Sequence, residues 1–259
     1  YLDMMADHWN AVVINDYDAV MPLPWKKKWL FRSYYHVPFL PQTGIYGNVD
    51  PALFKQITKV VFKKIRYGEI FLNAGNREYA KYLAARPLVN MVLHLDAPYE
   101  TMHEGYHRDL NKHLLKAAGH RLTYSADNNV KSLVRLFRKR NGSKITSLKR
   151  SDYERFTSLC LHLVYTGKAI IRKVNDSNER LLAMGLLLKD ERRIYNLMNV
   201  ELADGRSKCA NYFLFDQLIK EFAGSELIFD FEGSHKFYKI FGAVNEPYFL
   251  YTRFSRWLQ

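Results

Sequence analysis

The chain has 259 residues, of which 48% are hydrophobic and 15% aromatic, a composition typical of a packed globular protein that excludes a disordered chain. Lys and Arg number 39 against 26 Asp and Glu, which gives a formal net charge of +13. Such a charge has two readings: a surface for an anionic partner (nucleic acid, a nucleotide-linked substrate, coenzyme A or a membrane surface), or an ordinary basic surface.

No apolar run approaches the roughly 20 residues of a membrane helix, so we expect no membrane span. The two cysteines, Cys160 and Cys209, form neither a disulfide framework nor a zinc pattern, which indicates a reducing cytoplasm. The chain begins at Tyr1 instead of a methionine, and we expect its N-terminal end to have been trimmed. The sequence leaves the oligomeric state open.

The first half predicts strands, one helix and further strands, in that order. The strands are 11–16, 18–25, an extended stretch 33–47, and then 69–73 and 88–95. The helix, 50–66, has apolar residues at helical spacing, with Asp50 as its N-cap and Pro51 at its first position.

The second half repeats this order, after two helices at 130–140 and 152–165. Its strands are 168–174, 181–190, 192–200, 226–231 and 247–254, with a helix at 207–224 and a short helix at 235–241. The pattern predicts an α/β (α+β) protein of two similar halves, each with a mixed, mostly antiparallel sheet flanked by helices. We place the boundary near Pro98, giving halves 1–98 and 99–259, joined by a basic helix that ends at Gly119.

The segment HEGYH (103–107) satisfies the zinc-peptidase pattern H-E-x-x-H, and His113 follows where a third ligand would stand. Leu110 replaces the glycine that the extended motif needs, and Gly105 weakens the helix. An ordinary basic helix with exposed histidines is the better interpretation, and the zinc peptidase stays a remote alternative. We assign no metal ligand.

Two basic segments are candidates for contact with phosphate. The helix 130–140 carries Lys131, Arg135, Arg138 and Lys139 opposite its apolar stripe, and such a row either follows phosphates or is simply a solvated face. The turn 201–208 carries Arg206 and Lys208 before a helix N-terminus, which favours anion binding. A polar loop with a helix cap at Ser207 explains the turn equally well.

The segment 226–241 has the most informative pattern in the chain. Strand alternation places Phe229 and Phe231 on one face and puts Asp230 and Glu232 together on the other, roughly 7 Å apart. Ser234 is placed to cap the following helix. The carboxylates serve a reaction or tie down the neighbouring loops, and the pattern leaves both readings open.

The segment "FDFEGS" followed by "KFYKIFGA" resembles the end of Fem-type (FemABX) aminoacyl transferases and their GNAT-fold relatives. The segments "AVVINDYDAVMPLPWKKK", "VPFLPQTGIYG" and "GYHRDLNKHLLKA" resemble earlier parts of the same family. The resemblance implies a tandem GNAT-like (acyl-CoA N-acyltransferase) fold and the transfer of an acyl or aminoacyl group to an amine, in Fem enzymes for cell-wall peptides.

The resemblance also implies roles for individual residues. Asp230 and Glu232 are the candidate catalytic carboxylates. The candidate substrate-binding residues are Tyr195, Asn196, Asn199, Ser234, Lys236 and Tyr238. The candidate phosphate-binding residues are Arg108, Lys112, Arg206 and Lys208. Aminoacyl-tRNA and acyl-CoA are both candidate donors, although the sequence lacks the glycine-rich loop of GNAT acetyltransferases. The alternative is a non-catalytic binding module for an anionic partner such as tRNA or a nucleotide-linked ligand.

Overall fold

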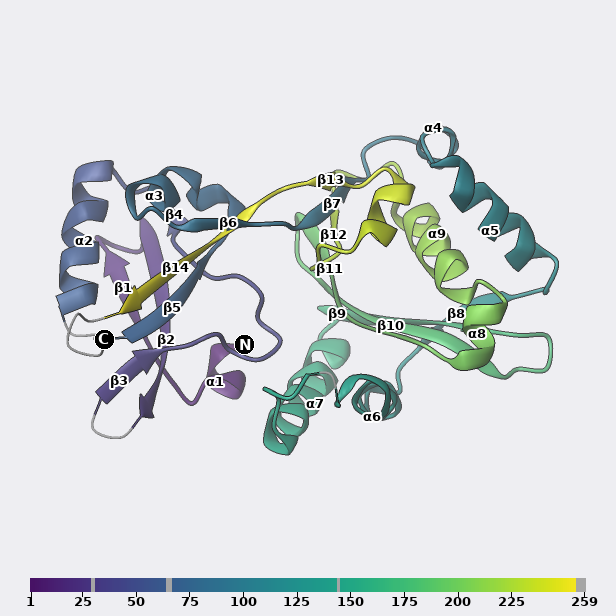
Figure 1. The fold of residues 1–259 in the computed structure, drawn as a ribbon, viewed down its shortest axis with the longest axis horizontal. Helices are drawn as coiled ribbons and strands as arrows, with labels where there is room; N and C mark the ends of the chain where they lie inside the picture. Colours follow the sequence, from purple (N-terminus) through teal and green to yellow (C-terminus); the bar gives the residue numbers. More distant parts are fainter. Residues whose placement is uncertain (29–30, 64–66, 144, 255–259) are drawn as a thin grey trace. The chain divides into compact units, whose positions relative to one another are not determined.

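The computed structural model describes residues 1–28, 31–63, 67–143 and 145–254 (Figure 1). The chain forms two compact units. The first consists of Tyr1–Val89 together with the chain from Glu246 onward, and the second of Asn90–Asn245. Among the described residues, no helix is both long enough and apolar enough to cross a membrane.

The first unit is built on a mixed sheet with the strand order β1-β2-β3-β5-β14-β6, and β4 pairs with β2. Its elements are α1 (Leu2–Met5), β1 (His8–Ile14), β2 (Ala19–Lys28), β3 (Phe31–Tyr34), β4 (Tyr46–Gly47), α2 (Pro51–Lys63), β5 (Tyr67–Leu72), η1 (Ala74–Asn76), α3 (Arg77–Tyr82), β6 (Arg86–Leu88) and β14 (Tyr248–Phe254).

Helix α2 begins where its sequence predicts. The Asp50 carboxylate accepts a hydrogen bond from the Ala52 N–H at 2.8 Å, so it caps the first turn, and Pro51 opens the helix without a lost donor. The buried residues Phe54 and Ile57 face the sheet, while Val60 is 62% exposed. Residues 64–66 of the predicted helix lie outside the described residues.

The second unit is built on a mixed sheet with the strand order β13-β7-β12-β11-β10-β9-β8. Its elements are β7 (Met91–His94), α4 (Tyr99–Glu104), α5 (Arg108–Ala118), β8 (Thr123–Asp127), α6 (Val130–Asn141), α7 (Arg150–Tyr165), β9 (Ala169–Asn175), β10 (Leu181–Lys189), β11 (Arg193–Glu201), α8 (Ala203–Ser207), α9 (Ala210–Phe222), β12 (Ile228–Asp230), η2 (Lys236–Phe241) and β13 (Val244–Asn245).

Helices cover both faces of this second sheet. Helix α9 packs on β9 and β10, and α5 packs on α9, whereas α6 and α7 pack against β11, β10 and β9 from the other side (Figure 1). The buried α9 side chains, Leu214, Phe215, Leu218 and Ile219, join the main core of the unit. This spacing of i, i+1, i+4 and i+5 gives the single apolar stripe of an amphipathic helix.

The same strand arrangement occurs in both units. In the first, β1, β2 and β3 form an antiparallel meander, α2 follows, and β5 returns parallel to β3. In the second, β9, β10 and β11 form the meander, α8 and α9 follow, and β12 returns parallel to β11. The predicted fold class, two similar α/β halves with mixed sheets, is confirmed.

The two units exchange strands. β7 belongs to the first half of the sequence but pairs with β12 of the second unit, and β14 belongs to the second half but pairs with β5 of the first unit. The division at Val89 and Glu246 therefore differs from the boundary near Pro98 that the sequence indicates. Alternation of apolar residues marks a strand, but it does not specify which sheet the strand joins.

Candidate functional site

The strand β12 delivers two carboxylates to the end of the second sheet. Phe229 and Phe231 are buried and lie against Phe215 of α9, with ring centroids 6.1 and 5.6 Å apart from it. Asp230, between them, is 1% exposed and points to the other side of the strand. The aromatic anchors therefore fix the position at which the chain turns after Asp230.

Asp230 is held by hydrogen bonds on both of its oxygens. Oδ1 accepts from the Asn90 Nδ2 and from the Glu232 N–H, each at 2.9 Å. Oδ2 accepts from Arg193 Nη1 at 3.0 Å, and Asn90 also accepts from the Gly233 N–H at 3.1 Å. Burial raises the pKa of the Asp230 carboxyl, and these donors oppose that rise. This geometry favours a positioning role for Asp230.

Glu232 lies in a different environment. Its φ of 50° is in the left-handed region, which a residue with a side chain rarely adopts without support from its surroundings. Its side chain is partly exposed, and no hydrogen-bond donor reaches its carboxylate within the part of the chain that the structure describes. Burial first, and the charge of Asp230 second, raise the pKa of Glu232. Glu232 is therefore the stronger candidate for contact with a substrate.

The strands β11 and β12 separate beside this pair of carboxylates. They are paired at three positions, ending with Tyr195 opposite Asp230, while β11 continues to Glu201. The ladder between β10 and β11 shifts its register opposite Leu186 and Leu187, so β11 bulges near this point. Beyond Tyr195, none of the described strands pairs with β11 on its β12 side. Its backbone N–H and C=O groups are thus available to an extended ligand.

The predicted substrate-binding residues on β11 lie near this separation. Tyr195 donates its hydroxyl to Asp190 at 2.8 Å, and Asn196 is buried. Among the residues that the structure describes, the Nδ2 of Asn199 is buried without a hydrogen-bond partner, and so is the Oδ1 of Asn211 on α9. Unpartnered buried amides are costly, and a ligand amide, which both donates and accepts hydrogen bonds, would satisfy them. Asn211 is not among the residues that the sequence analysis singles out. The signal that could have found it is a polar side chain in the first turn of an otherwise amphipathic helix.

The turn after β12 holds the remaining predicted substrate contacts. Tyr238 packs on Phe231 with ring centroids 4.4 Å apart, and burial raises the pKa of its hydroxyl. Ser234 and Lys236 are exposed. The predicted cap at Ser234 is wrong, because the Nδ1 of His235 accepts the hydrogen bond from the Phe237 N–H that caps η2. The turn between β12 and η2 is therefore one residue longer than a cap at Ser234 would make it.

The predicted phosphate-binding residues on α5 lie near its N-terminus. Arg108 and Lys112 are both exposed, and Lys112 pairs with Asp109 at 3.1 Å. The predicted basic helix itself is confirmed, because α5 runs from Arg108 to Ala118 with Gly119 as its C-cap.

The predicted phosphate-binding residues near α8 each lie within ion-pair distance of an acidic side chain. Lys208 binds Asp176 at 2.7 Å, and Arg206 lies 3.7 Å from Glu201. Lys208 holds the pKa of Asp176 down to about 2. The predicted helix cap at Ser207 is wrong, because Ser207 is the last residue of α8 and donates its hydroxyl to the Asp204 carbonyl.

The zinc-peptidase pattern does not lie on one helix. α4 ends at Glu104 with Gly105 as its C-cap, and α5 starts after its N-cap, His107. The His107 ring accepts from the Asp109 N–H at 3.3 Å, and His113 stacks on Tyr212 with centroids 4.0 Å apart. The break at Gly105 removes the helical spacing that two zinc ligands need. Among the described residues, no group of three or more metal-ligating side chains is assembled.

This break gives a prediction about metal. We expect the protein purified without chelator to contain far less than one zinc per chain, and EDTA to leave its melting temperature unchanged. Elemental analysis and a thermal melt measure both quantities. One tightly bound zinc per chain that is lost on His103→Ala and on His107→Ala would contradict this geometry.

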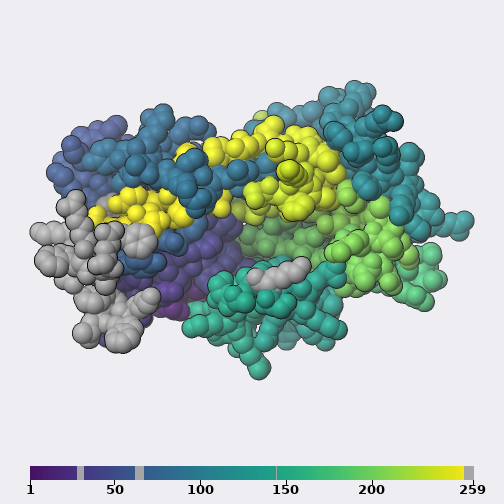
Figure 2. Space-filling model, viewed as in Figure 1, coloured from purple at the N-terminus to yellow at the C-terminus, as the bar shows by residue number. Residues whose placement is uncertain are grey.

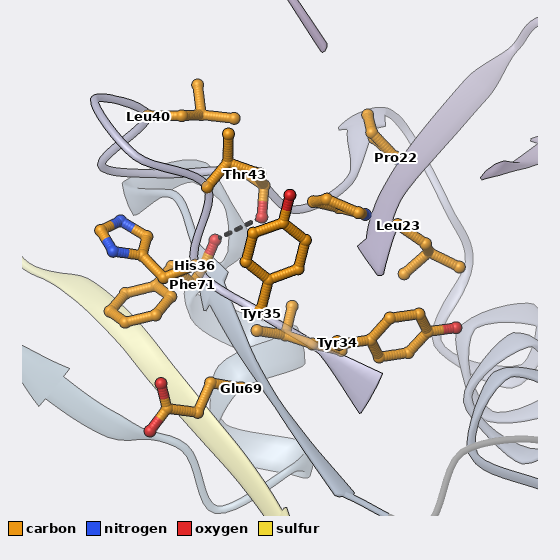
Figure 3. A pocket seen from close by; sticks show the side chains of 12 residues that line it. Pro22, Leu23, Tyr34, Tyr35, His36, Leu40, Thr43, Glu69 and Phe71 are labelled. Atoms are coloured by element: carbon orange, nitrogen blue, oxygen red, sulfur yellow. Dashed lines mark hydrogen bonds between the residues drawn. The ribbon is translucent and has the colours of Figure 1, made fainter. Parts of the chain in front are cut away.

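The first unit has a pocket at the corresponding strand separation, where β3 and β5 are paired at two positions. Figure 3 shows Tyr34, His36, Thr43 and Phe71 in its wall, with the Thr43 hydroxyl donating to the Phe71 carbonyl at 2.9 Å. The His36 ring lies 4.3 Å from that of Phe71, and burial lowers the pKa of His36. The pocket has an accessible volume of about 10 Å³, which is room for about one water molecule. A substrate needs more space than this.

Solved structures share this fold. FemX superposes with a TM-score of 0.63 at 14% identity, covering 94% of this chain and 88% of its own. The C-terminal domain of a putative lysylphosphatidylglycerol synthetase from Agrobacterium fabrum gives 0.61 at 12% identity, covering 95% and 84%. L-PGS from Bacillus licheniformis gives 0.58 at 12% identity, covering 96% and 84%.

No protein-family model and no curated protein matches the sequence. At 12–14% identity, the likeness to the solved structures concerns the fold. It extends over nearly all of this chain, both units included. The chain therefore has a Fem-like fold, shared with FemX, the putative lysylphosphatidylglycerol synthetase domain and L-PGS, as the resemblance of its sequence implied.

Proposed function

We propose that the protein transfers an acyl or aminoacyl group from an activated donor to an amine, with Glu232 as the general base. The observation that carries this proposal is the contrast between the two carboxylates. Asp230 is saturated with donors, whereas the Glu232 carboxylate has none among the described residues and stands where β11 and β12 separate. A carboxylate that receives no hydrogen bonds is the one of the pair that more readily accepts a proton.

The raised pKa of Glu232 suits an amine acceptor. An alkylammonium has a pKa of about 10, and an ordinary carboxylate takes up its proton poorly. Burial and the neighbouring charge of Asp230 raise the pKa of Glu232 toward that of the acceptor. The closer match makes the proton transfer from the ammonium to Glu232 less uphill.

The proposed reaction is balanced as follows. Glu232 takes a proton from the ammonium, and the free amine attacks the carbonyl carbon of an ester or thioester donor. The new C–N bond gives a tetrahedral oxyanion, which a backbone N–H on the open edge of β11 would stabilise. The C–O or C–S bond then breaks, and Glu232 returns its proton to the leaving group. The nitrogen releases its remaining extra proton to solvent, which leaves a neutral amide.

The comparisons support a transferase of this class through the fold. The similar domain from Agrobacterium fabrum belongs to a putative lysylphosphatidylglycerol synthetase, a name that describes the joining of a lysyl group to phosphatidylglycerol. We propose an aminoacyl-tRNA or acyl-CoA donor for this chain, and a cell-wall peptide amine as the first acceptor to test. The resemblance of its sequence to Fem-type enzymes supports this order.

A ligand screen followed by a transfer assay tests the proposal. We expect a charged tRNA or an acyl-CoA to raise the melting temperature, and a labelled acyl group to appear on the acceptor amine. Glu232→Gln should keep the thermal shift and lose the product. A donor that binds equally well to both variants with no product from either one would assign the chain to the binding-module alternative.

The pKa of Glu232 also predicts a pH-dependent stability. In the unfolded chain this carboxyl has a pKa of about 4.3, and the folded chain raises it. The folded state therefore holds the proton more tightly, so this contribution to stability is present below about pH 4.3 and is lost as the pH rises through the folded pKa. Wild type should lose melting temperature relative to Glu232→Gln from pH 5 to 9. A difference between the two variants that stays constant over this range would contradict the raised pKa.

A further inference from the structure

The second unit carries a groove between α6 and α7 that the proposed reaction does not use. Its accessible volume is about 640 Å³, and Val134 and Tyr153, which are both buried, lie at its base. The cations Lys131, Arg135, Arg138 and Lys139 line one wall, and Thr157 and Ser158 line the other. Figure 2 shows this part of the chain, in teal, at the molecular surface. We call it the α6–α7 groove.

The charge of the groove is uncompensated. Helix α6 contains five basic residues and no acidic one. None of the four lining cations forms an ion pair within the described part of the chain. The acid of the lining, Glu154, is already bound to Arg150 at 2.7 Å. Like charges at i and i+4, such as Lys131 and Arg135, destabilise a helix, so a bound anion would relieve a cost that the free protein bears.

The cations form a row. At 100° per residue, Lys131, Arg135 and Arg138 lie within about 60° of one another on α6, and the row from Lys131 to Lys139 extends about 12 Å. The guanidinium of Arg138 lies 5.7 Å from the Tyr153 ring centroid, a cation–π contact that holds it at the groove. A row of this length fits several phosphates in succession better than a single small anion.

An exposed aromatic side chain extends the same face of α7. Leu161 and Tyr165 follow Ser158 at i+3 and i+7, so they lie on the helix face that lines the groove. Leu161 is 41% exposed and Tyr165 is 91% exposed. A basic groove that follows a backbone, with an aromatic ring beside it on which a base stacks, is the usual chemistry of single-strand recognition.

We propose that the α6–α7 groove binds single-stranded nucleic acid, with its phosphates along α6 and a base on Tyr165. A bilayer surface is the other anionic partner to consider, and the exposed ring of Tyr165 beside the row of cations favours a ligand with bases that stack. The shared ligand chemistry is a sugar–phosphate backbone with unpaired bases, and RNA and DNA both supply it. The proposal does not depend on the transfer reaction or on Glu232.

The test measures the binding of fluorescein-labelled U12 and dT12 by anisotropy, over a series of salt concentrations. We expect Lys131→Gln/Arg135→Gln to weaken binding at least tenfold at low salt. Because each phosphate contact on a single strand contributes about 0.7 to the slope of log K against log salt, that slope should fall by about 1.4. Tyr165→Ala should weaken binding about tenfold and leave the slope unchanged.

The matched control is Lys55→Gln/Lys59→Gln, an exposed lysine pair with the same i, i+4 spacing on α2. It removes the same charge from a different helix and should leave the affinity within twofold of wild type. An equal loss of affinity in both double variants would show that the effect comes from the net charge of the protein, and it would overturn the proposal. Binding to vesicles of phosphatidylglycerol, with no binding to U12 or dT12 at the same salt, would also overturn it. Stronger binding of U12 than of dT12 would support the proposal with RNA as the ligand.

Discussion

Replacement of Glu232 by glutamine is expected to lower the rate of acyl or aminoacyl transfer by a factor of about 10² to 10⁴, the usual contribution of a general base. Glutamine keeps the size of the side chain and cannot accept the proton of an ammonium ion. Its effect should lie in the chemical step, so kcat falls while donor binding stays unchanged. A single-turnover assay with a labelled donor measures this rate.

The matched control for this prediction is Glu78→Gln, a charge-neutralising change at an exposed glutamate on α3 of the first unit, whose ion pair with Lys81 lies at the surface. It should retain the transfer rate of wild type to within a few fold. Equal rates for Glu232→Gln and wild type, with both variants folded, would show that the proton leaves by another route. The assignment of Glu232 as the base would then be wrong.

Replacement of Asp230 by alanine is expected to destabilise the protein by about 3–5 kcal/mol, the cost of breaking a buried ion pair from one side. The substitution removes the acceptor for Asn90, for Arg193 and for the Glu232 N–H. The turn that presents Glu232 should loosen as well, so activity falls together with stability. Urea unfolding followed by fluorescence measures the change in the free energy of unfolding.

Asp109→Asn is the control for this stability prediction. Asp109 forms an exposed ion pair with Lys112 on α5, and such pairs contribute little because water screens them. We expect no measurable change in its unfolding midpoint. A similarly small effect for Asp230→Ala would mean that the hydrogen bonds around Asp230 do not hold the turn.

Local patterns in the sequence predicted most of the elements. Asp50 and Pro51 mark the start of α2 because a capping carboxylate and an N1 proline act on the adjacent turn. The burial of Phe229 and Phe231 on the core side of β12 follows from period-two alternation alone. These features depend on neighbours within a few residues, so a single sequence contains them.

The exchange of β7 and β14 between the units was not predictable in this way. Each strand has an apolar pattern that suits either sheet, and its partner is chosen by contacts far along the chain. The break in the HEGYH segment has a local signal, Gly105, and the sequence had pointed to it as a weak place in the helix. The sequence predicts Ser234 as the cap of η2, whereas the structure has His235, and intrinsic residue preferences do not resolve a helix start to within one residue.

The sequence located the candidate site, but it did not distinguish the role of Asp230 from that of Glu232. Asp230 and Glu232 have equivalent places in the alternating pattern. Their difference comes from Asn90 and Arg193, which are 140 and 37 residues away from Asp230. A polar residue within the apolar segment "LVNMVLHL" was the available signal for Asn90. What that residue binds is a property of the folded chain.

The central claim is that Glu232 accepts the proton of the acceptor amine, and the pH dependence of single-turnover transfer tests it most directly. Wild type and Glu232→Gln share the ionisation of the acceptor, so the ratio of their rates isolates Glu232. That ratio should increase as the pH rises through the raised pKa of Glu232, because the base acts in its ionised form. A ratio that stays constant from pH 5 to 9 would contradict the claim.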